Sequence, residues 1–228
     1  MKGKRRFLAL VRQLGRFAFV PVSEMHRLGQ QKPDWLLAVA PTIFCASMQL
    51  ASATIVARKV IPRLELQVKQ LKLASHGLTM VAAVSAINAA ASYPILLVTS
   101  AMYVVAIDVA LHDGKSVKRL AEAAGISMLT QIPNSLVVLS IALTWMPRSE
   151  SVSSLSVGSL PLLANLGTGL SLLLKISAAL STLWLIVMLG IALRVVAKIH
   201  YRSLITAGVF LILVAGSAHF LMARMFAQ

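Results

Sequence analysis

The sequence predicts an all-α, polytopic integral membrane protein with about five transmembrane helices and further amphipathic helices at the membrane interface. Two observations lead to this fold class. Hydrophobic residues make up 58% of the 228 residues, charged residues only 13%, and the mean hydropathy is +0.82. Five apolar stretches are also long enough to cross a hydrocarbon layer roughly 30 Å thick, which takes about 20 helical residues. We therefore expect lipid to be the solvent of most of the chain.

The first part of the chain, residues 1–34, is predicted to be a basic amphipathic segment. Over residues 5–19, apolar residues recur at helical spacing and arginines fall on the other face, which is typical of a helix in the membrane interface. The basic residues expected at the membrane surface are Arg5, Arg6, Arg12 and Arg16. Pro21 ends this helix, and Ser23 is predicted to cap a second short helix that runs to about Gln30.

The second part, residues 35–228, is predicted to be the membrane domain. Its first span covers residues 35–57, and residues 60–73 form a surface helix or an extension of that span. Residues 78–111 are an apolar run of 34 residues, about 51 Å long as a helix. We favour one long helix kinked at Pro94 over two segments, because two crossings need about 40 residues and a turn.

The later predicted elements alternate between spans and connections. They are a third span near residues 120–146 with a bend at Pro133, a Ser-rich loop over 147–159, a helix resting on the membrane over 160–174, a fourth span over 177–196 and a fifth over 204–222.

Small residues mark one face of the second span. They recur every three or four positions, as in helices that approach closely in lipid, and are Ala82, Ser85, Ala86 and Ala90. Asn88 lies among them and is expected to bond a neighbouring helix, with ligand contact as the alternative. We therefore predict a helix-packing surface here, which would also serve for contact with partner proteins.

Two charged residues lie within or beside the spans. Asp108 is predicted to form an interfacial ion pair with Lys115 or Arg119, and the alternative is a role in a proton or ion path. Lys175 is expected to extend its ammonium group to the interface at the start of the fourth span, with substrate contact as the alternative.

The distribution of Lys and Arg predicts the orientation. A cytoplasmic N-terminus leaves eight of the 22 Lys and Arg residues outside, and these are Arg58, Lys59, Arg63, Lys69, Lys72, Arg148, Lys175 and Arg224. Because positive residues concentrate on the cytoplasmic side, we expect the N-terminus to be cytoplasmic, in a bacterial inner membrane. The net charge of +15 is attributed to anionic lipid rather than to nucleic acid, since no aromatic-rich polar surface is available to stack bases.

No pattern indicates an enzyme, a metal site or a cofactor. Cys45 is the single cysteine, and the five histidines are scattered without ligand spacing. The Gly114-Lys115-Ser116 turn lacks the glycine that a phosphate-binding loop needs at position 109, where Val109 stands. No serine lies in a Gly-x-Ser-x-Gly turn. We therefore predict a non-enzymatic protein without cofactors.

Three segments carry a resemblance to a known family. The block FVPVSEMHRLGQQKPDWLLAVAP resembles the entry to the membrane domain of bacterial proteins in the Ypt/Rab-interacting protein (YIP) family. LHDGKSVKRLAEAAGISMLTQIPNSL is similar to that family's Gly-Lys turn and proline-bent third span, and LWLIVMLGIALRVVAKI to its fourth span. The resemblance covers roughly residues 19–222. It implies five spans, a cytoplasmic N-terminus and no catalytic residues.

These observations lead to one functional hypothesis and two alternatives. We expect a scaffold or assembly partner in the lipid bilayer that contacts other membrane proteins or a second copy of itself. A transporter, a channel or an accessory subunit of an export system is the first alternative, suggested by Asp108, Asn88 and the proline bends. A lipid-organising protein that uses the basic N-terminal helix is the second.

Overall fold

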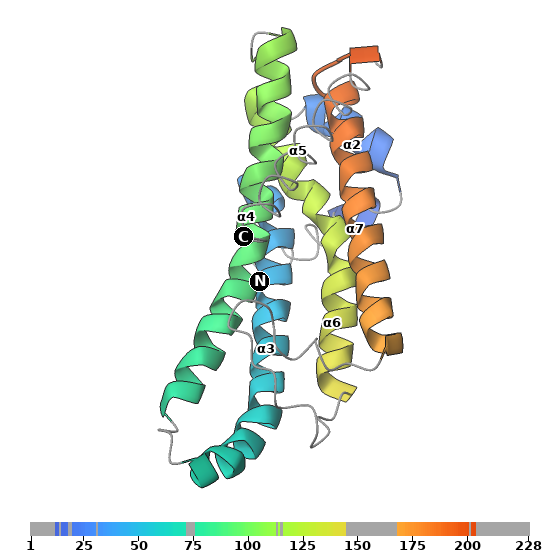
Figure 1. Cartoon of the computed structure of the whole chain (residues 1–228). Coiled ribbons are helices and arrows are strands. Elements are labelled where there is room, and N and C mark those ends of the chain that lie inside the picture. The colour runs from blue at the N-terminus through green and yellow to red at the C-terminus, as the bar shows by residue number, and fades with distance from the viewer. Residues whose placement is uncertain are drawn as a thin grey trace, which may run out of the picture.

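Every regular element that the computed structural model describes is a helix. The described residues are 12–13, 15–17, 20–30, 32–71, 76–112, 114, 116–144, 168–200 and 202–203. Their main elements are α2 (Pro21–Gln30), α3 (Trp35–Leu71), α4 (His76–His112), α5 (Val117–Ser127), the 3-10 helix η1 (Met128–Gln131), α6 (Ile132–Thr144) and α7 (Thr168–Val195) (Figure 1). These described residues contain no strand, which confirms the predicted all-α class.

Four helical stretches are long and apolar enough to cross a membrane. They are Trp35–Lys59 of α3, Ala86–Leu111 of α4, Val117–Thr144 across α5, η1 and α6, and Gly169–Val195 of α7. They correspond to the first four predicted spans. The predicted fifth span, residues 204–222, and the Ser-rich loop, residues 147–159, lie outside the described residues.

Helices α3 and α4 are longer than a membrane crossing requires. Each has 37 residues and is therefore about 55 Å long. The stretch predicted as a surface helix or an extension is a continuation of α3, which runs to Leu71. The long apolar run is one helix that continues through Pro94, as favoured from the sequence. Figure 1 shows the end of α3 projecting beyond the end of α6 and the start of α7, and α4 changing direction along its length.

The third span is interrupted immediately before Pro133. Proline has no N–H, so it cannot donate the helical hydrogen bond to the carbonyl of Leu129. The N–H of Ile132 donates to Leu129 instead, one residue closer than in an α-helix. The predicted bend is therefore a short 3-10 segment, η1, that separates α5 from α6.

The start of α7 corrects the prediction of a separate helix on the membrane surface over residues 160–174. From Thr168 onward these residues belong to the same continuous helix as the fourth span. No proline or charged residue precedes Lys175 within α7, so nothing in that stretch ends the helix. Residues 160–167 lie outside the described part of the chain.

Packing is uneven around the bundle. Helix α3 packs against α4, α5 and α6, whereas α2 packs against α7 and α5. Within the span windows, 44% of the α3 residues are buried inside the protein, but only 17% of those of α4. Most of α4 therefore faces outward, toward lipid or toward another protein.

Candidate functional site

A buried carboxylate joins the first and third spans at the end of the bundle where α3 begins. Asp34 precedes α3, and its Oδ1 accepts hydrogen bonds from the backbone N–H groups of Leu36 and Leu37 at 3.0 and 3.4 Å. Glu122 of α5 accepts the N–H of Asp34 through Oε1 at 2.8 Å. A Glu within the same helix commonly accepts this N–H in a capping box. Here a different helix supplies it, and the first turn of α3 is fixed to α5.

One turn further along, α3 and α5 approach each other very closely. A Cβ atom at Gly125 would overlap the carbonyl oxygen of Ala38 and lie 2.8 Å from its Cβ atom. Only glycine leaves room for this contact. Small residues permit such approach between helices in lipid, where van der Waals contact replaces the hydrophobic effect. The contact and the Asp34–Glu122 hydrogen bond together define the crossing of the first and third spans.

Asp108 is completely buried at the turn between α4 and α5. Its Oδ2 accepts the backbone N–H of Ser116 at 2.9 Å, directly before α5 begins. Its backbone carbonyl accepts the N–H of Gly114, whose φ of 70° suits a glycine. The predicted ion pair with Arg119 is not formed between these two described residues, because Asp108 caps the turn and Arg119 is exposed. Lys115, the other predicted partner, lies outside the described residues.

At the other end of the bundle, Lys59 binds the last turn of α6. Its Nζ donates to the carbonyl oxygens of Ala142 at 2.8 Å and Leu143 at 2.7 Å. Carbonyls in the last turn of a helix generally lack helical partners, and a positive charge is favourable there. The sequence showed Lys59 only as a flank of the first span. Its position at a span end was the available signal, but its partner could not be predicted.

Lys175 lies near the same end of the bundle as Lys59. Its neighbour Leu174 packs against Ile141, one residue before Ala142. The Lys175 side chain is exposed. This position is compatible with the prediction of a lysine at a membrane boundary. Lys175 belongs to none of the described polar clusters.

A polar cluster crosses the middle of the bundle, next to the break in the third span. The Tyr93 hydroxyl and Ser135 Oγ are hydrogen-bonded at 2.9 Å, and Ser135 Oγ donates to the carbonyl of Gln131 at 3.0 Å. Gln131 Nε2 donates to the carbonyl of Ser181 at 3.1 Å. Side chains from α4, α6 and η1 and the backbone of α7 therefore meet here. Sequence reasoning identified Pro133 but did not identify this cluster.

The small-residue face is used inside the chain. Ala86 is buried and Ala90 half-buried, whereas the side chains of Ala82 and Ser85 lie outside the described part. Helix α4 packs chiefly against α3, so this face cannot be the contact surface for a partner where it is buried. Asn88 is exposed, and its side chain makes no hydrogen bond within the described part of the chain. Its predicted bond to a neighbouring helix is therefore not formed in this bundle.

Helix α2 packs on the bundle through its apolar face. Met25 and Leu28 of α2, together with Phe17 before this helix, are buried in the same cluster as Leu193 of α7. Phe17 thus contacts protein. Arg12 and Arg16 are exposed, as expected of membrane-surface residues, while Arg5 and Arg6 lie outside the described residues.

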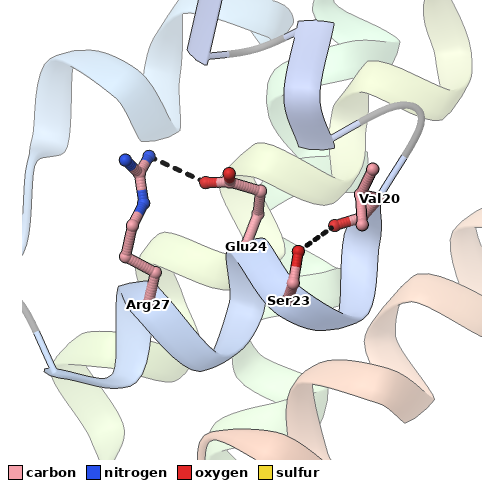
Figure 2. Close-up of polar contacts among 4 residues, drawn as sticks. All are labelled: Val20, Ser23, Glu24 and Arg27. Carbon is pink, nitrogen blue, oxygen red and sulfur yellow. Dashed lines mark hydrogen bonds and ion pairs between the residues drawn. The ribbon is translucent and has the colours of Figure 1, made fainter.

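Polar contacts of α2 remain local (Figure 2). Arg27 forms an ion pair with Glu24 at 2.7 Å, and Ser23 Oγ donates to the carbonyl of Val20 at 3.3 Å. Ser23 therefore lies inside the first turn of α2, which begins at Pro21, and is not the predicted N-terminal cap. Proline is well suited to that first position, because its N–H would be unpaired there anyway.

No group of three or more His, Cys, Asp or Glu side chains in the described residues could hold a metal ion. No protein-family model, curated protein or solved structure matches this chain. The arrangement of the described polar residues therefore has to be interpreted from its own contacts. Asp34, Lys59, Asp108 and Glu122 all bind backbone groups at helix ends, and they serve to fix the bundle.

Proposed function

We propose that this protein is a non-enzymatic scaffold of the YIP type, which binds another membrane protein or a second copy of itself. The supporting observation is an exposed apolar surface at the start of α4, before its membrane span and at the beginning of that span. We call this surface, formed by Met80, Val84, Ile87 and Asn88, the α4 contact face. The exposed fractions of Met80, Val84 and Ile87 are 72%, 51% and 63%.

The position of the α4 contact face argues against lipid as its only neighbour. Lys59 binds the last turn of α6 and so lies where the third span ends. From Val60 to Leu71, α3 continues for 12 residues, or about 18 Å, past that level. The start of α4 before Ala86, which carries Met80 and Val84, also lies outside the stretch that is able to cross the membrane. Apolar side chains beyond the hydrocarbon layer are stabilised when another apolar surface covers them.

Site-specific photo-crosslinking in native membranes tests this proposal. A photoreactive amino acid at Met80 or Val84 should give covalent adducts with protein. Matched controls are Leu183 and Ile186 of α7, which are exposed to a similar extent, 59% and 60%, but lie within a span. These controls should give lipid adducts. Lipid adducts alone at all four positions would contradict the proposed contact.

We further propose a bacterial inner membrane location with the N-terminus in the cytoplasm. In support of this orientation, exposed basic residues gather at the end of the bundle that carries α2 and the start of α5; they are Arg12, Arg16, Lys32, Lys118, Arg119, Arg194, Lys198 and Arg202. Protease protection of an N-terminal tag in intact spheroplasts, with loss of protection on lysis, is the expected result. Cleavage of the tag in intact spheroplasts would contradict this orientation.

A transporter or an accessory subunit of an export system is a second candidate. It is favoured by the interrupted third span, where η1 lies next to the buried side chains of Tyr93, Gln131 and Ser135. Carriers commonly build their sites from interrupted helices and polar groups within the membrane. A flux into reconstituted vesicles that Asp108→Asn abolishes, with assembly intact, would support this candidate. The lipid-organising alternative is less favoured, because Phe17, Met25 and Leu28 already pack on the bundle.

A further inference from the structure

Helix α3 presents a row of polar side chains to the interior of the bundle. Thr42, Cys45 and Gln49 are three and four residues apart, so they lie on one face of the helix at successive turns. Thr42 is 3% exposed and Cys45 is fully buried. Cys45 lies beside Ser135 of α6, so this face is directed at the break in the third span. Thr42 and Cys45 therefore lie within the protein, and Gln49 is half-buried.

Three oxygen atoms around this row are buried and have no hydrogen-bond partner among the described residues. They are Thr42 Oγ1, Gln49 Oε1 and Asn134 Oδ1. A polar group that is buried without a partner is destabilising, and the surrounding hydrocarbon offers it no hydrogen bond. Two of the three atoms are amide oxygens, which only accept hydrogen bonds. The matching ligand must therefore donate hydrogen bonds.

The surroundings restrict that ligand to a small one. Asn134 lies beside Tyr93, and the Tyr93–Ser135 hydrogen bond lies beside Cys45, so α3, α4 and α6 converge here. One turn before Thr42, the contact between Ala38 and Gly125 brings two helix backbones together. This contact closes the cluster toward the start of α3. A small molecule that donates hydrogen bonds and fits between close-packed helices satisfies both conditions.

We propose that Thr42, Gln49 and Asn134 form a binding site for water in the middle of the membrane bundle. Each water has two protons, so water here donates to the two amide oxygens and accepts a hydrogen bond from the Thr42 hydroxyl. A hydrated cluster beside η1 gives the interrupted third span exchangeable hydrogen-bond partners. The span can then change its geometry there without exposing backbone groups to lipid.

Cys45 provides an internal probe of this site, because it is the single cysteine of the chain. The full chain is reconstituted in lipid vesicles and transferred to heavy water, and the S–H stretching band is followed by infrared spectroscopy. The thiol should exchange its proton for deuterium while the helical amide bands stay protected. A thiol that keeps its proton as long as the protected amides do would overturn the proposal.

Three apolar variants test which residues hold the water. Thr42→Val, Gln49→Leu and Asn134→Leu should each slow thiol exchange on the order of tenfold, the factor that follows from the loss of one hydrogen bond. The control is Thr54→Val, because Thr54 is on the same helix, is exposed and already donates to the carbonyl of Leu50. Equal slowing by this control, or no slowing by any of the three, would overturn the proposal.

A rescue separates water binding from damage to the fold. Thr42→Ser keeps the hydroxyl and should restore the exchange rate of the wild-type protein. If Thr42→Val does not assemble, Gln49→Leu and Asn134→Leu carry the same test from different helices. Slow exchange in Thr42→Ser together with a wild-type helical spectrum would contradict a role for the hydroxyl.

Discussion

Glu122 accepts a hydrogen bond from the backbone N–H of Asp34 across 88 residues of sequence, at 2.8 Å. The carboxylate is 2% exposed, so this hydrogen bond forms away from water. It connects the first residue before α3 to the second turn of α5, next to the Ala38–Gly125 contact. Replacing Glu122 should therefore affect the arrangement of two spans and not only one helix end.

Glu122→Leu should lower the free energy of unfolding by about 1–3 kcal/mol, because the N–H of Asp34 loses its partner while it remains partly buried. Glu122→Gln keeps an acceptor oxygen at the same place and should lose less. Unfolding in a denaturing detergent measures both values. The exposed Lys118 on the same helix supplies the control, and Lys118→Ala should change little. Equal losses for Gln and Leu at position 122 would argue against the hydrogen bond.

Gly125→Ala should destabilise the protein by about 1–3 kcal/mol, since the new methyl group overlaps the backbone of Ala38 and forces α3 and α5 apart. Gly190→Ala is the matched control, because a Cβ atom at Gly190 meets nothing within 4 Å. Alanine has the higher helix propensity, so this control should be neutral or stabilising by up to about 1 kcal/mol. Detergent unfolding compares the two variants. A tolerated alanine at position 125 would mean that the helices are further apart.

Lys59→Met should loosen the last turn of α6. The carbonyls of Ala142 and Leu143 lose a charged donor, and charge at a helix C-terminus contributes about 0.3–1 kcal/mol. Hydrogen exchange of the backbone in the last turn of α6 should therefore become faster. Arg58→Met removes a neighbouring, exposed positive charge and serves as the control. Faster exchange in both variants alike would indicate a general effect of charge.

Asp108→Ala should cost about 1 kcal/mol of unfolding free energy, as for other helix caps, because the N–H of Ser116 loses its acceptor. Asp108→Asn keeps an oxygen and should retain most of the stability. Comparison of these two variants distinguishes a hydrogen-bonding role of the Asp108 side chain from a role of its charge in transport. An Asn variant that is as unstable as the Ala variant would show that the negative charge itself is needed.

The sequence predicted the spans well, because crossing hydrocarbon requires a certain apolar length and this length can be read directly. It also favoured a single helix through Pro94, since residues 78–111 are too few for two crossings. The sequence left open whether the residues after Lys59 form a separate surface helix or an extension of the first span. Both would show the same amphipathic pattern. The continuous α7 was missed for the related reason that periodicity does not show where a helix leaves the membrane.

The roles of the polar residues could be predicted only in part. Asp108 was identified as a costly carboxylate near the membrane, but its partner is a backbone N–H whose position depends on the turn before α5. Glu122 was not singled out, although a carboxylate near the start of a span was a usable signal. Its contact with Asp34 depends on how two distant helices cross. Gln131 and Ser135 were missed because polar residues inside a span follow no fixed spacing when they bond to several different helices.

The most direct test of the proposed scaffold is the native mass of the tagged full chain, extracted gently from its membranes. The proposal predicts a complex larger than one chain, with a stoichiometric membrane partner or a second copy. Met80→Lys together with Val84→Lys on the α4 contact face should release that partner, whereas Leu183→Lys together with Ile186→Lys should not. A wild-type mass equal to that of one chain, with lipid and detergent only, would contradict the account.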